Sequence, residues 1–129
     1  MTTSLAGCCQ VDLGTLRRVT RIATQGRQDA PQWVTSYKLA YSTTGSTYSY
    51  VSDDAGGERV FAANSDENTI VEHALGHVML ARFVRVYPQA WQQHMSLRWE
   101  LYGCGPSKTC RVAEKLCSSS TIDKELPLY

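Results

Sequence analysis

The segment Ala81–Cys104, ARFVRVYPQAWQQHMSLRWELYGC, constrains the fold most strongly, because it has the pattern of two β-strands with a turn between them. Apolar residues occupy every second position from Leu97 to Leu101, the period of a strand with one buried face. The first strand is expected over Phe83–Tyr87 and to end at Pro88, since proline has no amide hydrogen to give to a sheet. A pair of strands is marginally stable at best in water, so the remaining chain must supply the rest of the sheet.

Before this segment, short apolar stretches alternate with turn signals rich in glycine, proline, serine and aspartate. The expected strands are Cys8–Leu13, Leu16–Thr24, Trp33–Ser42, Tyr48–Val51, Arg59–Ala62, Thr69–Glu72 and Leu75–Val78. In the third of these, Tyr37, Leu39 and Tyr41 share one face. No window of about a dozen residues keeps a helical period. Many short strands with frequent turns predict an all-β, antiparallel sandwich or barrel.

The C-terminal part of the chain has a different pattern. From Gly105 onward strand alternation is absent and three serines follow one another at 118–120. We expect residues 105–129 to form a tail outside the core, with one or two helical turns over Val112–Cys117. The expected organisation is therefore a segment of residues 1–9, a domain of residues 10–104 and this tail.

The overall composition excludes some classes of function. The chain of 129 residues has 13 basic and 12 acidic residues and a net charge of +1. This balance gives neither the basic patch of a nucleic-acid-binding protein nor a polybasic membrane segment. Apolar residues make up 43% of the chain, enough for a hydrophobic core, and no run of about 18 apolar residues indicates a membrane-spanning helix.

The cysteine pattern points to an oxidising compartment. Five cysteines in a short chain are typical of extracellular domains, and an odd number leaves at least one unpaired if all pairing is internal. Met1–Gly7 has neither the basic start nor the apolar stretch of a signal peptide. We expect the chain to be a fragment rather than a protein that has lost its leader.

Four sequence pieces resemble the discoidin family, also called the coagulation factor V/VIII C-type domain. They are QVDLG at Gln10–Gly14, TQGR with WVTSYKLAYS within Thr24–Ser42, ARFVRVYPQAW at Ala81–Trp91 and LRWELYGC at Leu97–Cys104. Their order and spacing match the family over residues 10–104. The resemblance implies a jelly-roll β-sandwich similar to galactose-binding domains, and a non-catalytic extracellular module.

The chain departs from the family pattern at its start. Family members have a longer segment before the QVDLG strand, which includes a first cysteine and one binding loop. This chain has only residues 1–9 there, and Cys8 and Cys9 stand where the family tends to have a tryptophan and an aliphatic residue. The chain therefore resembles a discoidin domain without its N-terminal third. One of the two adjacent cysteines is a candidate partner for Cys104, and Cys110 could pair with Cys117.

Two loops are the candidate ligand-binding site that the resemblance implies, because family members bind phospholipid head groups, glycans or proteins through loops at one end of the sandwich. The candidate residues are Arg27, Gln28, Asp29, Ala30, Pro31, Gln32, Trp33, Asn64, Ser65, Asp66, Glu67 and Asn68. The alternative is that both loops are ordinary solvated connections, with Trp33 packed in the core. The acidic tip made by Asp66 and Glu67 argues against an anionic membrane surface, which attracts lysine and arginine.

Other candidate sites favour a structural interpretation. Trp91 and Trp99 match core positions of the family, and tryptophan on a strand is more often packed than exposed to a sugar. Arg82, Arg85 and Arg98 are expected on sheet faces with cross-strand partners such as Glu100.

His73 and His77 are spaced like metal ligands on a helix. However, the residue after His73 is Ala74 rather than the glutamate of zinc proteases. Neither a metal, a cofactor nor an enzymatic site is expected.

The predicted function is recognition of an extracellular glycan or protein, with a phospholipid surface as a further candidate partner and no nucleic acid. The alternative is a truncated structural remnant without a ligand. Strands that lack their usual neighbours would then be open edges, through which the remnant would self-associate.

Overall fold

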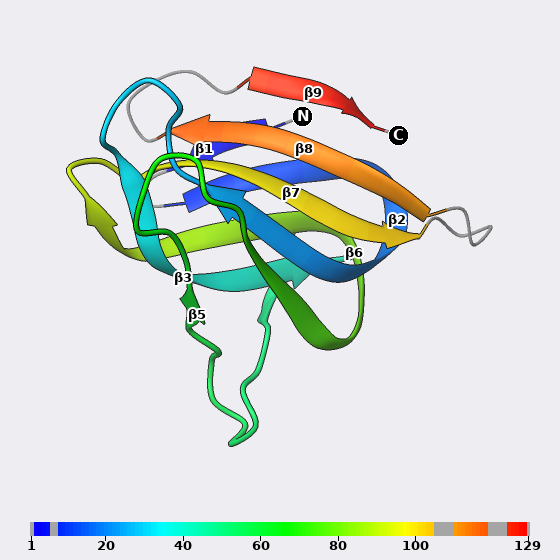
Figure 1. Ribbon diagram of the computed structural model, residues 1–129. Coiled ribbons are helices and arrows are strands. Elements are labelled where there is room, and N and C mark those ends of the chain that lie inside the picture. The colour runs from blue at the N-terminus through cyan, green and yellow to red at the C-terminus, as the bar shows by residue number, and fades with distance from the viewer. Residues whose placement is uncertain (1, 6–7, 105–109, 119–123, 129) are drawn as a thin grey trace.

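A computed structural model describes residues 2–5, 8–104, 110–118 and 124–128 of the chain, and side-chain environments within residues 9–103 (Figure 1). The strands are β1 (Thr2–Leu5), β2 (Cys8–Gln25), β3 (Trp33–Ser42), β4 (Ser49–Tyr50), β5 (Phe61–Ala62), β6 (Val71–Gln92), β7 (Ser96–Cys104), β8 (Cys110–Ser118) and β9 (Lys124–Leu128). Within these residues all regular structure is β and every strand pair is antiparallel, as predicted. None of the described segments forms a helix that could cross a bilayer.

Strand β2 is central to the curled sheet. The strand order is β4–β3–β6–β2–β7–β8–β9, with β1 added to β2 and β5 added to β3. One edge of β2 pairs with β6, while the other pairs first with β1 and then with β7. The prediction that the segment 81–104 forms a pair of strands is therefore correct for the strands and wrong for their pairing. β6 and β7 are consecutive along the chain, but β2 lies between them.

Several predicted strands merge into longer, bent ones. The predicted strands Cys8–Leu13 and Leu16–Thr24 form the single strand β2, which bends at Gly14, whose φ is 84°. At this bulge, residues 13–16 lie opposite Arg82 alone, because Asp12 pairs with Phe83 and Arg17 with Ala81. A bulge of this kind bends the strand.

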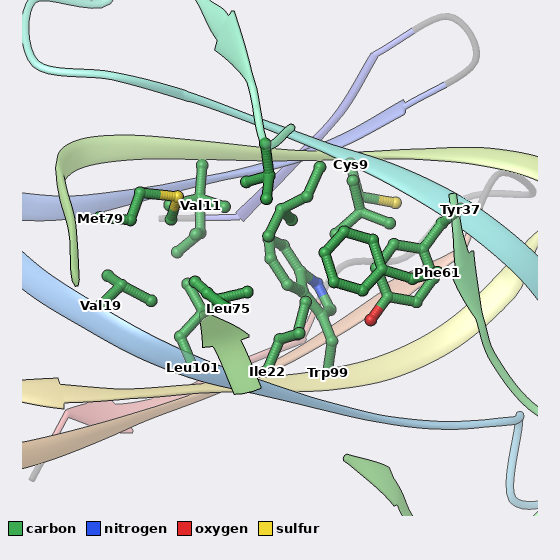
Figure 2. Close-up of a cluster of buried hydrophobic side chains, with 14 of the residues drawn as sticks. Cys9, Val11, Val19, Ile22, Tyr37, Phe61, Leu75, Met79, Trp99 and Leu101 are labelled. Carbon is green, nitrogen blue, oxygen red and sulfur yellow. The ribbon is translucent and has the colours of Figure 1, made fainter. Parts of the chain in front are cut away.

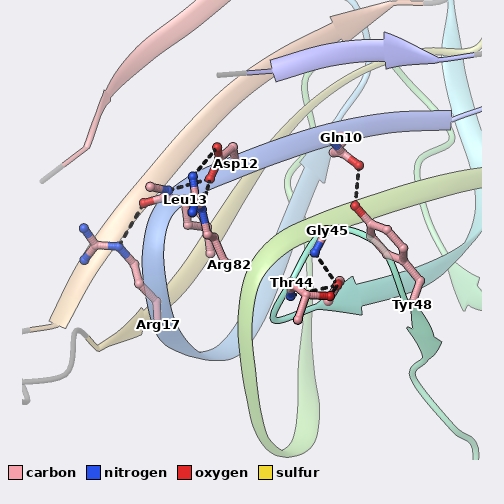
Figure 3. Close-up of polar contacts among 10 residues, drawn as sticks. Gln10, Asp12, Leu13, Arg17, Thr44, Gly45, Tyr48 and Arg82 are labelled. Carbon is pink, nitrogen blue, oxygen red and sulfur yellow. Dashed lines mark hydrogen bonds and ion pairs between the residues drawn. The ribbon is translucent and has the colours of Figure 1, made fainter.

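Polar contacts hold the bend in β2 (Figure 3). The guanidinium of Arg82 donates from Nε to Asp12 Oδ1 at 3.0 Å and from Nη2 to Asp12 Oδ2 at 3.2 Å. Asp12 Oδ1 also accepts the amide of Gly14 at 2.8 Å. The hydrogen bonds from Arg82 lower the pKa of Asp12 below its ordinary value. Both strands of the bend are thus held by one carboxylate. Arg82 has a cross-strand partner, as predicted, but the partner is Asp12 rather than the suggested Glu100.

Pro88 does not end its strand. β6 runs through Pro88 to Gln92 and keeps pairing with β3. The ladder shifts register here, since Tyr37 pairs with Pro88 and Ser36 with Ala90. The missing amide is tolerated because the proline lies at a bulge, one of the positions where sheets accept it.

The core lies between the curled layers and contains the side chains predicted by alternation (Figure 2). Leu97, Trp99 and Leu101 are at most 3% exposed. Tyr37 stacks on Phe61 with ring centroids 5.0 Å apart. The buried apolar residues are Cys9, Val11, Leu13, Val19, Ile22, Ala23, Val34, Tyr37, Leu39, Ala40, Val51, Phe61, Leu75, Met79, Ala81, Val84, Val86, Leu97, Trp99 and Leu101.

Two predictions about packing are wrong. Trp91, expected in the core, is 45% exposed, because the ladder between β6 and β2 ends at Val86 and Trp91 lies beyond it. The predicted helical turns over Val112–Cys117 are instead strand β8, which pairs with β7 along its whole length. Hydrogen bonding to the edge of β7 outweighs a weak local preference. The sheet thus continues past Cys104, although the proposed domain boundary at that point stays a prediction.

The structure gives one disulfide-bonded cysteine, and the predicted pairing of an adjacent cysteine with Cys104 stays a prediction. Cys9 is disulfide-bonded and buried, so at least one of the adjacent cysteines is in a bridge. The side chains of the other four cysteines lie outside the described residues, and their pairing stays a prediction.

A close contact between β2 and β7 requires glycine at position 103. A Cβ atom on Gly103 would lie 1.8 Å from the carbonyl oxygen of Arg18 and 2.9 Å from Cα of Val19. Both neighbours are backbone atoms of the central strand, so neither can move without breaking the ladder.

We therefore expect Gly103→Ala to lower the free energy of unfolding by about 3 kcal/mol, at the upper end of the range for overpacked sites. Gly57→Ala is the matched control, because its Cβ would be 3.4 Å from the nearest atom, a side-chain oxygen of Asp53. Urea denaturation should show a change of under about 1 kcal/mol for the control. Equal stability of the two variants would contradict the described contact.

Candidate recognition site

The two predicted loops lie at the same end of the molecule. The β2–β3 loop (residues 26–32) is light blue in Figure 1, and the β5–β6 loop (residues 63–70) is green beside it. The turn between β6 and β7 (residues 93–95) lies at this end as well. We call these three segments together the loop end.

Arg98 joins the two predicted loops. It lies on β7, and its Nε donates to the carbonyl oxygen of Gly26 at 2.8 Å. Its Nη2 donates to the carbonyl oxygen of Glu67 at 3.0 Å and to Oδ1 of Asn68 at 2.9 Å. Guanidinium presents its donors in a rigid fork, which allows one side chain to fix two backbone segments. Sequence reasoning assigned Arg98 only to a sheet face and missed this role.

Further hydrogen bonds fix the β5–β6 loop to the sheet. Asn64 Nδ2 donates to the carbonyl oxygens of Thr24 at 3.0 Å and Thr69 at 2.8 Å. Gln25 Nε2 donates to the carbonyl oxygen of Asn68 at 2.7 Å. Asn64 is only 2% exposed, so this predicted site residue holds the loop in place rather than presenting its side chain to solvent.

The two loops also approach closely at Gly26. A Cβ atom there would lie 2.7 Å from the carbonyl oxygen of Asp66 and 2.9 Å from Cβ of Trp33. A larger residue at position 26 would therefore push the loops apart.

Gln32 links the β2–β3 loop to the start of β7. Its Oε1 accepts from Ser96 Oγ at 2.9 Å and from Arg27 Nη1 at 3.3 Å. The backbone amide of Arg27 donates to the carbonyl oxygen of Gln32 at 2.9 Å, which closes the loop at its base. Gln32 is therefore engaged within the site, like Asn64.

The remaining predicted residues differ in their exposure. Ala30, Trp33 and Glu67 are half-buried. The predicted residues with exposed side chains are Gln28, Asp29, Pro31, Ser65, Asp66 and Asn68. Sequence reasoning missed five exposed residues at or near the same end, namely Ile70, Trp91, Gln92, Gln93 and His94. Trp91 was missed because its apolar character predicted burial, and its neighbours carried no motif.

The basic side chains of the loop end are engaged in contacts, and its exposed charges are carboxylates. Arg27 Nε contacts Asp29 Oδ1 at 2.8 Å, and this contact lowers the pKa of Asp29. Asp66 accepts from Oγ1 of Thr69 at 2.5 Å and from its amide at 2.8 Å, and these bonds lower the pKa of the carboxyl group. Because Arg98 is turned to the backbone, the described loop tips present no unpaired basic side chain.

A shallow hollow lies beside the Arg98 contacts on the outer face of β2 and β7. Its volume is about 170 Å³, and it is lined by Ala23, Thr24, Gln25, Ile70, Arg98, Trp99 and Glu100. It is open and small, so it suits part of a ligand rather than a whole enclosed one.

The described residues contain no cluster of three or more histidine, cysteine, aspartate or glutamate side chains that could hold a metal ion. His73, one of the two spaced histidines, has Nε2 2.6 Å from the carbonyl oxygen of Ala62 and its ring edge-on to Phe61. Its position is thus explained by packing and one hydrogen bond.

If Arg98 joins the loops, replacing it should affect both of them at once. We expect Arg98→Met to lower the free energy of unfolding by about 2 kcal/mol, because it removes hydrogen bonds from a charged group. Arg21→Met is the control, since Arg21 makes an exposed pair with Glu72 that is worth at most about 1 kcal/mol. Amide hydrogen exchange should speed up in both loops of the Arg98 variant, and an effect confined to one loop would contradict the proposed link.

The hydrogen bonds between Thr69 and Asp66 should make the stability of the β5–β6 loop depend on pH. Because the pKa of Asp66 is lowered from 3.8 in the folded state, the stabilisation by its carboxylate is present above that value and lost as the pH falls through the lowered pKa. Thr69→Val keeps the amide donor and removes the hydroxyl. In an NMR titration this variant should have an Asp66 pKa closer to 3.8, and an unchanged pKa would show that the hydroxyl bond has no effect.

Comparisons with known proteins agree with this architecture. The model of the F5/8 type C domain family matches residues 8–101. Lactadherin of Mus musculus is 43% identical over 97 residues, and retinoschisin of Takifugu rubripes is 40% identical over 96 residues. Each alignment covers 74% of this chain, but only 21% of lactadherin and 34% of retinoschisin. The chain thus spans about a fifth to a third of these relatives.

A solved structure gives the same fold. Discoidin II of Dictyostelium discoideum superposes with a TM-score of 0.67 and 33% sequence identity, over 79% of this chain and 40% of that chain. The expected antiparallel jelly-roll is therefore confirmed, as is the family resemblance seen in the four sequence pieces. The family match covers most of the chain, including β2 to β6 and most of β7. The chain belongs to the F5/8 type C, or discoidin, domain family.

Proposed function

We propose that the chain is a non-catalytic recognition module that binds an extracellular glycan through its loop end. The observation that carries this proposal is the set of hydrogen bonds from Arg98 to both loops. They hold two segments, far apart in the sequence, as one surface before any ligand arrives. A preorganised surface loses less conformational entropy on binding than separate flexible loops would.

The exposed side chains support a glycan. Trp91 offers a flat aromatic face, and its strand pairs with the start of β3, directly after the β2–β3 loop. The amides of Gln28, Asn68 and Gln92 are exposed at or near the same end. Amides and carboxylates bond sugar hydroxyls, and an aromatic ring provides apolar contact area. A protein partner could use the same exposed amides and Trp91, but these side chains do not favour a protein over a glycan.

An anionic membrane is not favoured at this end. The exposed carboxylates of Asp29 and Asp66 would be repelled by acidic head groups, and the Arg27 charge is already paired with Asp29. An extracellular location is supported by the Cys9 disulfide, because such bonds persist mainly in oxidising compartments.

The alternative of self-association through open sheet edges has less support. The outer edge of β3 is partly covered by β4 and β5, each only two residues long. Very short edge strands are one way in which proteins prevent edge-to-edge pairing.

The test is binding to an immobilised panel of neutral oligosaccharides. We expect Trp91→Ala to weaken binding about tenfold, since aromatic contacts contribute about 0.5–1.5 kcal/mol beyond their buried area. Gln28→Ala should weaken binding as well. Val60→Ala is the control, because Val60 is 54% exposed outside the loop end. An equal loss in the control would refute the site.

The ligand class has its own test. Vesicles of phosphatidylcholine alone and vesicles that also contain phosphatidylserine should both fail to bind. Binding to the anionic vesicles together with no signal on the oligosaccharide panel would overturn the glycan proposal.

A further inference from the structure

A second candidate interaction surface lies where β2 and β6 bend, away from the loop end. Leu16, Val78 and Leu80 are 40%, 53% and 47% exposed. Arg18 pairs directly with Leu80 across the two strands, so both side chains stand on one face of the sheet. We call Leu16, Arg17, Arg18, Val78 and Leu80 the basic apolar end. Neighbouring exposed apolar side chains of this size mark interaction surfaces more often than single ones do.

The charge of this surface is not neutralised within the described residues. Among the described side chains, the carboxylate of Asp12 lies near this surface, and it is bound by Arg82 (Figure 3). The Nε of Arg17 donates to the carbonyl oxygen of Leu13 at 3.5 Å, and the described part of the chain gives neither Arg17 nor Arg18 an acidic partner. A hollow of about 350 Å³ is lined by Thr15, Leu16, Arg17, Arg18 and Leu80. A partner for it should be both acidic and apolar.

The chain itself carries a surface of that kind. On the β5–β6 loop, Ile70 is 60% exposed, the largest exposure among the large apolar side chains that the structure describes. Asp66 and Glu67 lie three to four positions before it. Asp66 is exposed, and its hydrogen bonds with Thr69 lower the pKa of its carboxyl group. We call Asp66, Glu67 and Ile70 the acidic apolar end. Neither carboxylate forms an ion pair within the described residues.

We propose that copies of this chain associate head to tail, with the basic apolar end of one copy seated on the acidic apolar end of the next. Charge and apolar character are complementary between these two surfaces. Contact between two basic apolar ends would instead bring Arg17 and Arg18 against their own copies, and like charges in contact are strongly unfavourable. The contact is therefore heterologous, because it joins two different surfaces. Heterologous contacts form open chains of copies unless the rotation from one copy to the next closes a ring.

This association goes beyond glycan recognition and does not depend on it. It also differs from pairing of open strands, because it uses side chains of two bends and a loop rather than backbone edges. The attraction between the charges is screened by salt, so the assembly should weaken as ionic strength rises.

Sedimentation equilibrium of the whole chain tests the proposal. The weight-average mass should rise steadily above the monomer mass of 14.4 kDa as the protein concentration increases to about 1 mM in low salt, without a plateau at the dimer. A mass that stays at the monomer value over this range overturns the proposal, as does a plateau at twice that value.

Two variants identify the surfaces. Arg18→Glu combined with Leu80→Ser removes the basic apolar end, and Glu67→Lys combined with Ile70→Lys removes the acidic one. Each variant alone should remain monomeric, yet an equal mixture should form a dimer and stop there, since each retains one intact surface. Failure of the mixture to dimerise, or assembly of either variant alone, overturns the proposal.

Folding and ligand binding serve as controls. Circular dichroism should match the unsubstituted chain, and if a double variant is unfolded, the single changes Arg18→Glu and Glu67→Lys replace it in the same mixture. The Arg18→Glu, Leu80→Ser variant should keep full binding to the oligosaccharide panel. Loss of assembly with intact glycan binding in this variant separates the proposal from the proposed function. Loss of both in this variant, if it is folded, would contradict the independence of the basic apolar end from the loop end.

Discussion

Backbone pairing along both edges of β2 is the constraint on which the rest of the structure depends. Through β6 it reaches β3, and through β7 it reaches β8 and β9. The bend at Gly14 and the register shift near Val19 curl this strand, which brings β3 and β7 to opposite sides of one core. Because every loop of the loop end emerges from a strand of this sheet, the geometry of β2 determines which loops meet.

The hydrogen bonds of Arg98 hold the two loops together as one surface. β7 is the neighbour of β2, and Arg98 pairs with Gln25, the last residue of β2. Its guanidinium is therefore next to Gly26, at the start of one loop, and within reach of Glu67 and Asn68 in the other. The arrangement follows from strand order rather than from sequence proximity, and it leaves the exposed amides and Trp91 available for a ligand.

The sequence pattern predicted those features that depend on neighbouring residues alone. The limits of β3 and the buried face of β7 follow from alternation, which depends only on neighbouring residues. The insertion of β2 between β6 and β7 was not predictable in this way, because strand partners are chosen by global packing. The role of Arg98 left no motif, since two of its acceptors are backbone carbonyls. Trp91 was misjudged because its burial depends on where the ladder with β2 ends, and β8 because its pairing outweighs its weak helical pattern.

Backbone ¹⁵N relaxation tests most directly whether the two loops are held as one rigid unit with the sheet. We expect order parameters near 0.85 for the amides of Arg27, Asn64 and Thr69, equal to those of the strands. Each of these amides donates a hydrogen bond within the site. Values below about 0.6 in either loop would mean that it moves independently, and the preformed surface would not exist.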